Sequence, residues 1–217
     1  MQNKIIDINT AINLIKDGMT VMIGGFMCCG CPHNLIDALS KSTVKNLTVI
    51  SNDASIECDD IGKLFYTKKV KRFIASHVGL NPEAGKQIMN GECAVELVPQ
   101  GTLAERIRCG GAGLGGFLTK TGIGTEVERG KQIIMIENER YILELPLKAD
   151  VALIGATTAD EFGNLFYKGT TQNFNPLMAT AAETVIVEAD TICRVGEIEK
   201  ETIHTPGVFV DYIVCGE

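Results

Sequence analysis

The feature that most constrains the fold is a glycine-rich turn between a short apolar run and an amphipathic run. The apolar run covers residues 20–23, the turn covers residues 24–32, and the amphipathic run begins at His33. This order predicts a strand, a tight loop and a helix. Ligands of open α/β sheets bind at the carboxyl ends of strands, and glycine lets backbone N–H groups approach an anion closely. The turn is therefore the candidate ligand-binding loop.

Apolar runs and amphipathic runs alternate through the first half of the chain. Buried strands are expected at residues 20–23, 47–50, 70–75 and 94–98. Helices are expected between and after them, because the intervening segments carry helical spacing and capping residues such as Asn81 before Pro82. The alternation predicts an α/β fold in which a mainly parallel sheet is covered by helices on both faces, a three-layer α/β/α arrangement.

The second half begins with a change of pattern. Residues 109–125 are dense in glycine, and two apolar runs at 132–136 and 141–145 flank a short polar turn, which predicts a β-hairpin. A small antiparallel β insertion is therefore expected near residues 110–148. The later elements expected are strands at 150–154 and 184–188, a helix at 175–183 capped by Asn175, and an edge strand at 208–214. Residues 1–217 are expected to form a single domain.

The amino-acid composition limits which binding partners and which cellular location are expected for this chain. A net charge of −7 over 217 residues argues against nucleic acid or an anionic membrane as the main partner. No apolar run approaches the ~20 residues that a membrane-spanning helix needs, and the start of the sequence lacks a signal-peptide pattern. A cytoplasmic protein is expected, with its eight cysteines reduced.

Two glycine patterns match nucleotide-binding motifs in part. Residues 25–30 fit the G-x-x-x-x-G half of a P-loop, but Cys31 and Pro32 stand where Lys and Ser/Thr should be, which argues against hydrolysis of nucleoside triphosphates. Residues 111–116 fit G-x-G-x-x-G by letter. They follow a predicted helix and precede β structure, which is the wrong context for a dinucleotide fingerprint. A dinucleotide oxidoreductase is accordingly a minor alternative.

The cysteines and histidines give weaker signals. Cys28 and Cys31 form a C-x-x-C at a helix start, where a thiol pKa would be lowered, so a redox dithiol is an alternative to simple packing in a tight loop. A zinc site would need a second ligand pair at suitable spacing, and none is evident, so no metal site is expected. His33, His77 and His204 share no catalytic or metal-binding spacing.

A resemblance to a known family rests on residues 17–32, which read DGMTVMIGGFMCCGCP. They resemble the signature of the family I CoA-transferases: Asp/Asn-Gly, two free positions, three aliphatics, Gly-Gly-Phe, three free positions, Gly, one free position and Pro. Every fixed position is met, and the three cysteines occupy free positions. Further segments resemble the family at residues 99–108, 113–119, 143–153 and 168–175.

The resemblance implies the α subunit of a two-chain enzyme, expected as α2β2. Such an enzyme moves CoA between acetoacetate and a short-chain acid such as acetate or butyrate; a succinyl-CoA:3-ketoacid enzyme or a non-catalytic binding module on this fold are the alternatives. In this family a β-subunit glutamate in a Ser-Glu-Asn-Gly-type motif is the nucleophile. The nearest string here, residues 136–139, lacks the serine and the glycine. No catalytic residue is therefore assigned to this chain.

Coenzyme A and acyl-CoA are expected as substrates, with no permanently bound cofactor. The resemblance assigns CoA to the first turn, which consists of Gly24, Gly25, Phe26, Met27, Cys28, Cys29 and Gly30. Gly113, Gly115 and Gly116 are expected to line the active site. The physical reason is that each tetrahedral intermediate carries an oxyanion, which preorganised N–H donors stabilise by about 3–4 kcal/mol each.

Overall fold

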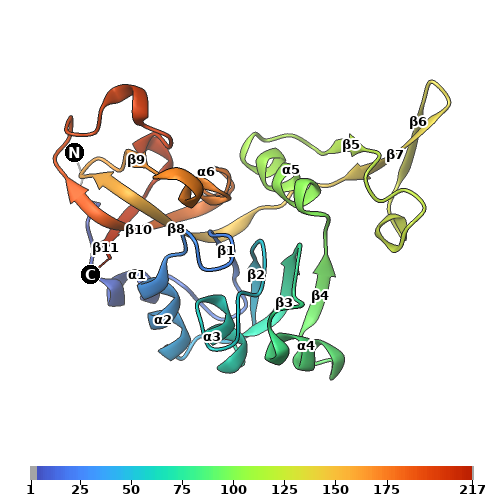
Figure 1. Ribbon diagram of the computed structural model, residues 1–217, viewed down its shortest axis with the longest axis horizontal. Helices are drawn as coiled ribbons and strands as arrows, with labels where there is room; N and C mark the ends of the chain where they lie inside the picture. Colours follow the sequence, from blue (N-terminus) through green and yellow to red (C-terminus); the bar gives the residue numbers. More distant parts are fainter. Residues whose placement is uncertain (1–3, 217) are drawn as a thin grey trace.

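The computed structural model describes residues 4–216 and is built around one eight-stranded sheet (Figure 1). Its strands are β1 (Thr20–Ile23), β2 (Leu47–Ile50), β3 (Val70–Ala75), β4 (Ala94–Leu97), β8 (Ala149–Asp160), β9 (Leu165–Phe166), β10 (Ala182–Cys193) and β11 (Tyr212–Cys215). The order is β11-β10-β8-β1-β2-β3-β4, with parallel pairing throughout, and β9 adds to β8 antiparallel. The predicted mainly parallel sheet is confirmed.

Helices cover both faces of this sheet (Figure 1). One face carries α1 (Ile8–Asn13), α2 (His33–Lys41), α3 (Ile61–Tyr66) and α4 (Pro82–Met89), and the other carries α5 (Gln100–Gly111) and α6 (Asn175–Met178). Successive side chains of a strand point to opposite faces. Accordingly Val21 and Ile23 belong to the core beneath α2, while Met22 belongs to the core beneath α5. No helix within residues 4–216 is long and apolar enough to cross a membrane.

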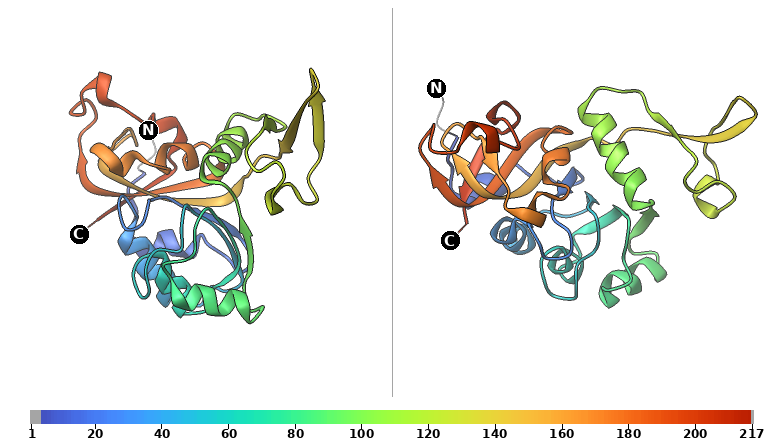
Figure 2. Two further views of the ribbon diagram at one scale, coloured as in Figure 1. Left: turned by 45° about the vertical axis from the view of Figure 1, so that its right-hand side comes forward. Right: turned by 45° about the horizontal axis from the view of Figure 1, so that its top comes forward.

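A second, antiparallel sheet forms an arm that extends away from the body (Figure 2). It comprises β5 (Phe117–Thr119), β6 (Ile133–Ile136) and β7 (Glu139–Glu144), in the order β5-β7-β6. Glu137 and Asn138 connect β6 to β7 with φ angles of 50° and 64°. Two successive positive φ angles are typical of a type I′ hairpin turn. The predicted β insertion near residues 110–148 is confirmed.

Four predicted elements differ in length from those observed. The helix expected over 175–183 ends at Met178, because the chain turns at residues 179–181 to enter β10. Asn175 does not cap it; Phe174 holds that position, and the Asn175 side chain bonds elsewhere. The edge strand expected over 208–214 is β11, which begins only after a 3₁₀ turn at Gly207–Phe209. β8 and β10 each run for twelve residues, well beyond the apolar runs that predicted them.

The strand order places β1 at a switch point. From β1 the chain order runs outward through β2, β3 and β4 on one side and through β8, β10 and β11 on the other. In open α/β sheets the crevice outside the carboxyl ends of the strands at such a point is where ligands bind. Residues 24–32 leave the carboxyl end of β1 at this crevice, and Gly24 donates its N–H to Leu153 of β8.

Candidate functional site

The loop after β1 is a tight turn that specifically requires glycine. Phe26 and Cys29 exchange backbone hydrogen bonds at 3.1 and 3.0 Å. Gly25 has a φ of +116°, which residues with a side chain rarely adopt. A Cβ at position 25 would lie 2.2 Å from the sulfur of Cys31. Both the backbone angle and the lack of space therefore select glycine at this position.

Asn175 fixes one end of this loop. Its Nδ2 donates to the carbonyl oxygens of Gly30 at 2.9 Å and Thr171 at 2.8 Å, and its Oδ1 accepts the N–H of Gly155 at 3.1 Å. The Asn175 side chain is fully buried. The N–H of Gly155 is buried and the two carbonyl groups are partly buried, so this one side-chain amide provides a partner to three shielded backbone groups.

Asn173 fixes the middle of the loop in the same way. Its Oδ1 accepts the N–H of Gly25 at 3.2 Å, and its Nδ2 donates to the carbonyl oxygen of Cys29 at 3.0 Å. The segments 24–30 and 168–175, which both carried the family resemblance in the sequence, are therefore in direct contact. The sequence predicted only a helix-capping role for Asn175 and no role for Asn173, because a residue that bridges distant segments leaves no local spacing signal.

A buried polar chain supports the opposite side of the loop. The N–H of Met27 donates to Asp53 Oδ2 at 2.8 Å, and Asn52 Nδ2 donates to the same oxygen at 2.6 Å. Gln100 at the start of α5 donates to Asn52 Oδ1 at 2.8 Å. The ends of β1 and β2 and the start of α5 are thus joined. The polar residues directly after the buried strand β2 were the available sequence signal for this connection.

Two hollows meet at Phe26, whose side chain is 44% exposed. Their volumes are about 290 Å³ and 670 Å³. Besides Phe26, the smaller hollow is lined by Gln100, Gly101, Ala104, Asn173, Phe174 and Leu177. The larger one is lined by Cys29, Gly169, Thr170, Gln172 and Asn173. Every lining side chain is neutral. A larger hollow, of about 1070 Å³, lies between α1 and α2 and does not include the loop.

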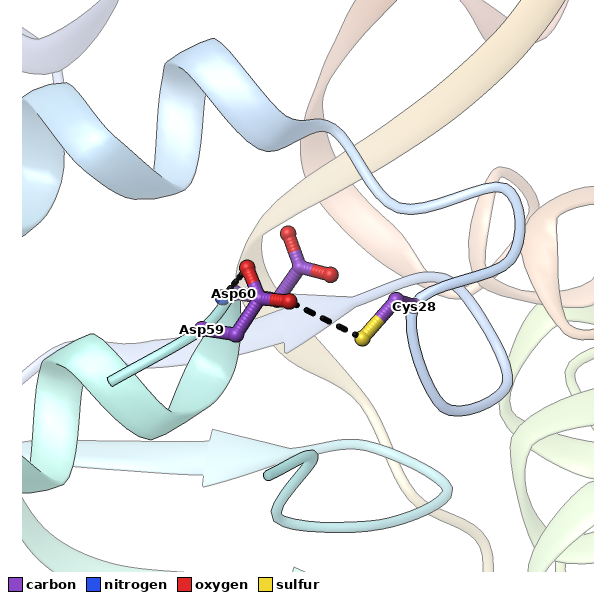
Figure 3. Close-up of side chains that lie close together, drawn as sticks. All are labelled: Cys28, Asp59 and Asp60. Carbon is purple, nitrogen blue, oxygen red and sulfur yellow. Dashed lines mark hydrogen bonds between the residues drawn. The ribbon is translucent and has the colours of Figure 1, made fainter. Parts of the chain in front are cut away.

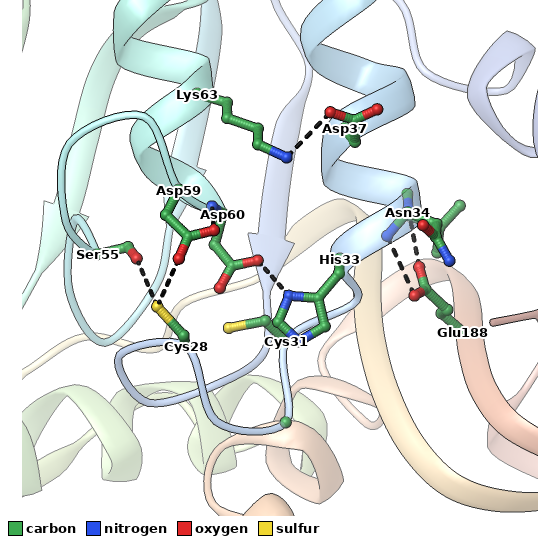
Figure 4. A network of polar contacts seen from close by, with 12 residues as sticks. Cys28, Cys31, His33, Asn34, Asp37, Ser55, Asp59, Asp60, Lys63 and Glu188 are labelled. Carbon is green, nitrogen blue, oxygen red and sulfur yellow. Dashed lines mark hydrogen bonds and ion pairs between the residues drawn. The ribbon is translucent and has the colours of Figure 1, made fainter. Parts of the chain in front are cut away.

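Cys28 and Cys31 do not form a low-pKa pair. Figure 4 shows both side chains close to Asp60. Burial raises the pKa of Cys28 to about 11, and burial together with the carboxylates of Asp60 and Asp53 raises the pKa of Cys31 still further. The lowered thiol pKa that a helix start suggested is therefore wrong, because desolvation outweighs any effect of the helix end. A redox dithiol loses its main support.

Gly113, Gly115 and Gly116 lie at the other end of α5. Gly113 lines a hollow with Thr20, the first residue of β1, whereas the 24–30 loop follows the last residue of that strand. α5 has twelve residues and separates its two ends by about 18 Å. The structure does not bring the two glycine turns together within this chain. A role for the second turn in lining the active site stays a prediction.

The glutamates with notable positions do not face the two hollows. Glu137 is exposed in the hairpin turn at the tip of the arm. Glu188 of β10 is buried, and its carboxylate accepts the N–H groups of Asn34 and Leu35 at 3.1 and 2.8 Å (Figure 4). Burial raises the pKa of Glu188. Its contacts hold the first turn of α2 against the sheet.

A comparison with protein families shows to which family this chain belongs. A family model described as Coenzyme A transferase matches residues 5–216. The chain belongs to the CoA-transferase family. The resemblance inferred from residues 17–32 is thereby confirmed over nearly the whole chain.

Individual relatives of this CoA-transferase agree with the family assignment. It is 56% identical over 214 residues to the acetoacetyl-CoA:acetate/butyrate CoA transferase alpha subunit of Clostridium acetobutylicum, covering 99% of this chain and 98% of that protein. It is 48% identical to the acetate CoA-transferase subunit alpha of Escherichia coli K12, covering 100% and 99%. An acyl-CoA transferase of E. coli O157:H7, solved as a thioester complex with CoA, superposes with a TM-score of 0.88 at 21% identity. The superposition covers 99% of this chain and 47% of that chain, which shows that the two share a fold.

Proposed function

We propose that this chain is the α subunit of a heteromeric CoA-transferase that moves CoA between acetoacetate and acetate or butyrate. The observation that carries the proposal is the 24–30 loop, which stands at the switch point of the sheet and is held by Asn173 and Asn175. The named activity of the relative at 56% identity supports the choice of substrates. Succinate as the acid is the alternative.

The loop contributes backbone and shape to this reaction. Its tip is held from both sides, so its geometry is set before a substrate arrives, and preorganised groups stabilise developing charge better than mobile ones. Phe26 separates two neutral hollows that suit the pantetheine arm and an acyl group, since such sites are mostly apolar with a few polar contacts. Gly24, Gly25, Met27, Cys28, Cys29 and Gly30 complete this CoA-binding loop.

The nucleophile in this proposal belongs to a β subunit. Its glutamate carboxylate attacks the thioester carbonyl and releases the CoA thiolate, forming an anhydride. The thiolate then attacks the glutamyl carbonyl, which releases the first acid and leaves a glutamyl-CoA thioester. The acceptor acid reverses both steps, so one difficult transfer is divided into easier ones. Gly113, Gly115 and Gly116 are proposed to line the active site where the two chains meet, with α2β2 as the assembly and the cytoplasm as the location.

The proposal is tested by reconstitution. The chain is co-expressed with a β chain that carries the Ser-Glu-Asn-Gly motif, and loss of acetoacetyl-CoA is followed with acetate, butyrate or succinate as acceptor. A heteromer by size exclusion, with turnover that requires both chains and is fastest with acetate or butyrate, supports it. A chain that neither assembles nor turns over refutes it. Turnover fastest with succinate replaces the substrate assignment.

A further inference from the structure

A cluster of metal-ligating side chains lies beside the loop and outside the two hollows. Cys28 comes from the loop, while Asp59 and Asp60 directly precede α3 (Figure 3). One ligand atom from each residue lies within 4.8 Å of the others. Sequence spacing gave no reason to expect a metal site, because 31 residues separate Cys28 from Asp59.

One oxygen in this cluster is buried without a partner. Asp60 is only 2% exposed. Its Oδ1 lies 2.5 Å from His33 Nδ1, while its Oδ2 has no hydrogen-bond partner among the described residues. Figure 4 shows this second oxygen directed toward the side of the cluster where Cys28 and Cys31 lie. A buried carboxylate oxygen left unpaired costs about 1–3 kcal/mol or more, so the position favours a positively charged ligand.

The distance between two of the donor atoms fits a small tetrahedral ion. Cys28 Sγ lies 3.4 Å from Asp59 Oδ2. Around zinc, with Zn–S of about 2.3 Å and Zn–O of about 2.0 Å, tetrahedral sulfur and oxygen ligands stand about 3.5 Å apart. Within residues 4–216, Asp59 has no ion pair, and the neighbouring Lys63 is engaged with Asp37 at 3.0 Å. No lysine or arginine among the described residues forms an ion pair with Asp59 or Asp60, although both lie near enough to Lys63 to contribute to its raised pKa.

We infer that Cys28, Asp59 and Asp60 bind one divalent cation of the zinc class. A thiolate with two carboxylates is a donor set for a borderline metal such as zinc, rather than for magnesium or calcium, which take oxygen alone. His33 holds the Asp60 carboxylate in place through its Oδ1. Binding releases the Cys28 thiol proton to solvent. The ion ties the loop to the start of α3, which is a structural role and not a chemical step of the transfer reaction.

Cobalt binding tests this inference on the full chain. The chain is reduced, stripped with a chelator, exchanged into buffer and titrated with Co²⁺. A thiolate-to-cobalt absorption band in the near ultraviolet is expected, saturating at one equivalent and abolished by Zn²⁺. Zn²⁺ is also expected to raise the melting temperature, because a ligand that binds only the folded state stabilises it. The absence of a saturable band overturns the inference.

Substitutions identify the residues that bind the metal ion. Cys28→Ser is expected to abolish the cobalt band, and Asp59→Asn, at a partly exposed position, is expected to weaken Co²⁺ binding at least tenfold. Cys58→Ser is the matched control, since Cys58 is exposed and adjacent to Asp59 but outside the cluster. A band that survives Cys28→Ser, or that falls equally in Cys58→Ser, contradicts the assignment. None of these readouts uses the transfer reaction, so failure here leaves the proposed function intact.

Discussion

The side-chain amide of Asn175 donates to the carbonyl oxygen of Gly30 at 2.9 Å, across 145 residues of sequence. The same side chain accepts the N–H of Gly155 in β8. A Cβ on Gly24 would lie 1.8 Å from the Asn175 Oδ1, so the loop and the amide occupy adjacent space with no room for a larger residue. The shape of the loop after β1 is therefore set by a residue near the far end of the chain.

Asn175→Ala is expected to lower the free energy of unfolding by about 2–3 kcal/mol, because it removes the partner of the partly buried Gly30 carbonyl and of the buried Gly155 N–H. Urea denaturation measures this. Asn13→Ala, at an exposed position in α1, serves as the control and should change stability by less than about 0.5 kcal/mol. Equal effects in the two variants would show that the amide does not hold the loop.

Gly25→Ala is expected to reduce turnover of the reconstituted enzyme at least tenfold, because the new Cβ collides with the Cys31 sulfur and the loop must shift. Gly130→Ala is the matched control: Gly130 also has a positive φ, of +76°, but open space around it. The control should lose about 1 kcal/mol of stability and retain activity. Full activity in Gly25→Ala would mean that the loop is only scaffold.

The fold was largely predictable from the sequence because its strands are short apolar runs separated by amphipathic helices. The strand predicted over residues 20–23 and the start of a helix at His33, for example, agree with the structure. The helix at Asn175 was predicted too long, and Asn175 was predicted as its cap although Phe174 holds that position. A capping residue before an apolar stretch gives the same sequence pattern whether or not its side chain forms its hydrogen bonds elsewhere. Of the candidate site, the sequence predicted only the loop after β1. Asn173, Asn175 and Gln100 act across the sheet, and such contacts are encoded by topology rather than by local spacing.

Stability should depend on pH through Glu96. Burial raises the pKa of this carboxyl, but hydrogen bonds from Arg106 at 2.6 Å and Arg72 at 2.7 Å outweigh burial and leave the pKa below its usual value. A carboxyl group whose pKa is lowered by folding stabilises the folded state at pH values above its pKa in the unfolded chain, which is about 4.3. This stabilisation is lost as the pH falls through the pKa of the folded state.

Glu96→Gln should therefore destabilise the chain by about 1–2 kcal/mol at neutral pH, with the difference from wild type shrinking as the medium becomes more acidic than about pH 4. Urea denaturation across this pH range measures it. Glu105→Gln, which removes an exposed pair with Arg108, should cost less than about 1 kcal/mol. A Glu96→Gln deficit that persists undiminished in acid would contradict the lowered pKa.

Cysteine reactivity should follow burial rather than the C-x-x-C pattern. Burial raises the pKa of Cys93 to about 11 and that of Cys31 further, whereas Cys58 and Cys215 are exposed. Since the thiolate is the reacting form, iodoacetamide at about pH 8 should modify Cys58 and Cys215 at least tenfold faster than Cys31 or Cys93. Peptide mass spectrometry gives the rates. Preferential modification of Cys31 would restore the redox hypothesis.

The location of the covalent intermediate shows directly which chain supplies the nucleophile. The reconstituted α–β enzyme is incubated with acetoacetyl-CoA in the absence of an acceptor acid, and the intact mass of each chain is measured. The β chain is expected to gain the mass of CoA in thioester linkage, this chain is expected to gain none, and acetate is expected to remove the adduct. A CoA adduct on this chain, or turnover by this chain alone, would contradict a nucleophile on the β subunit.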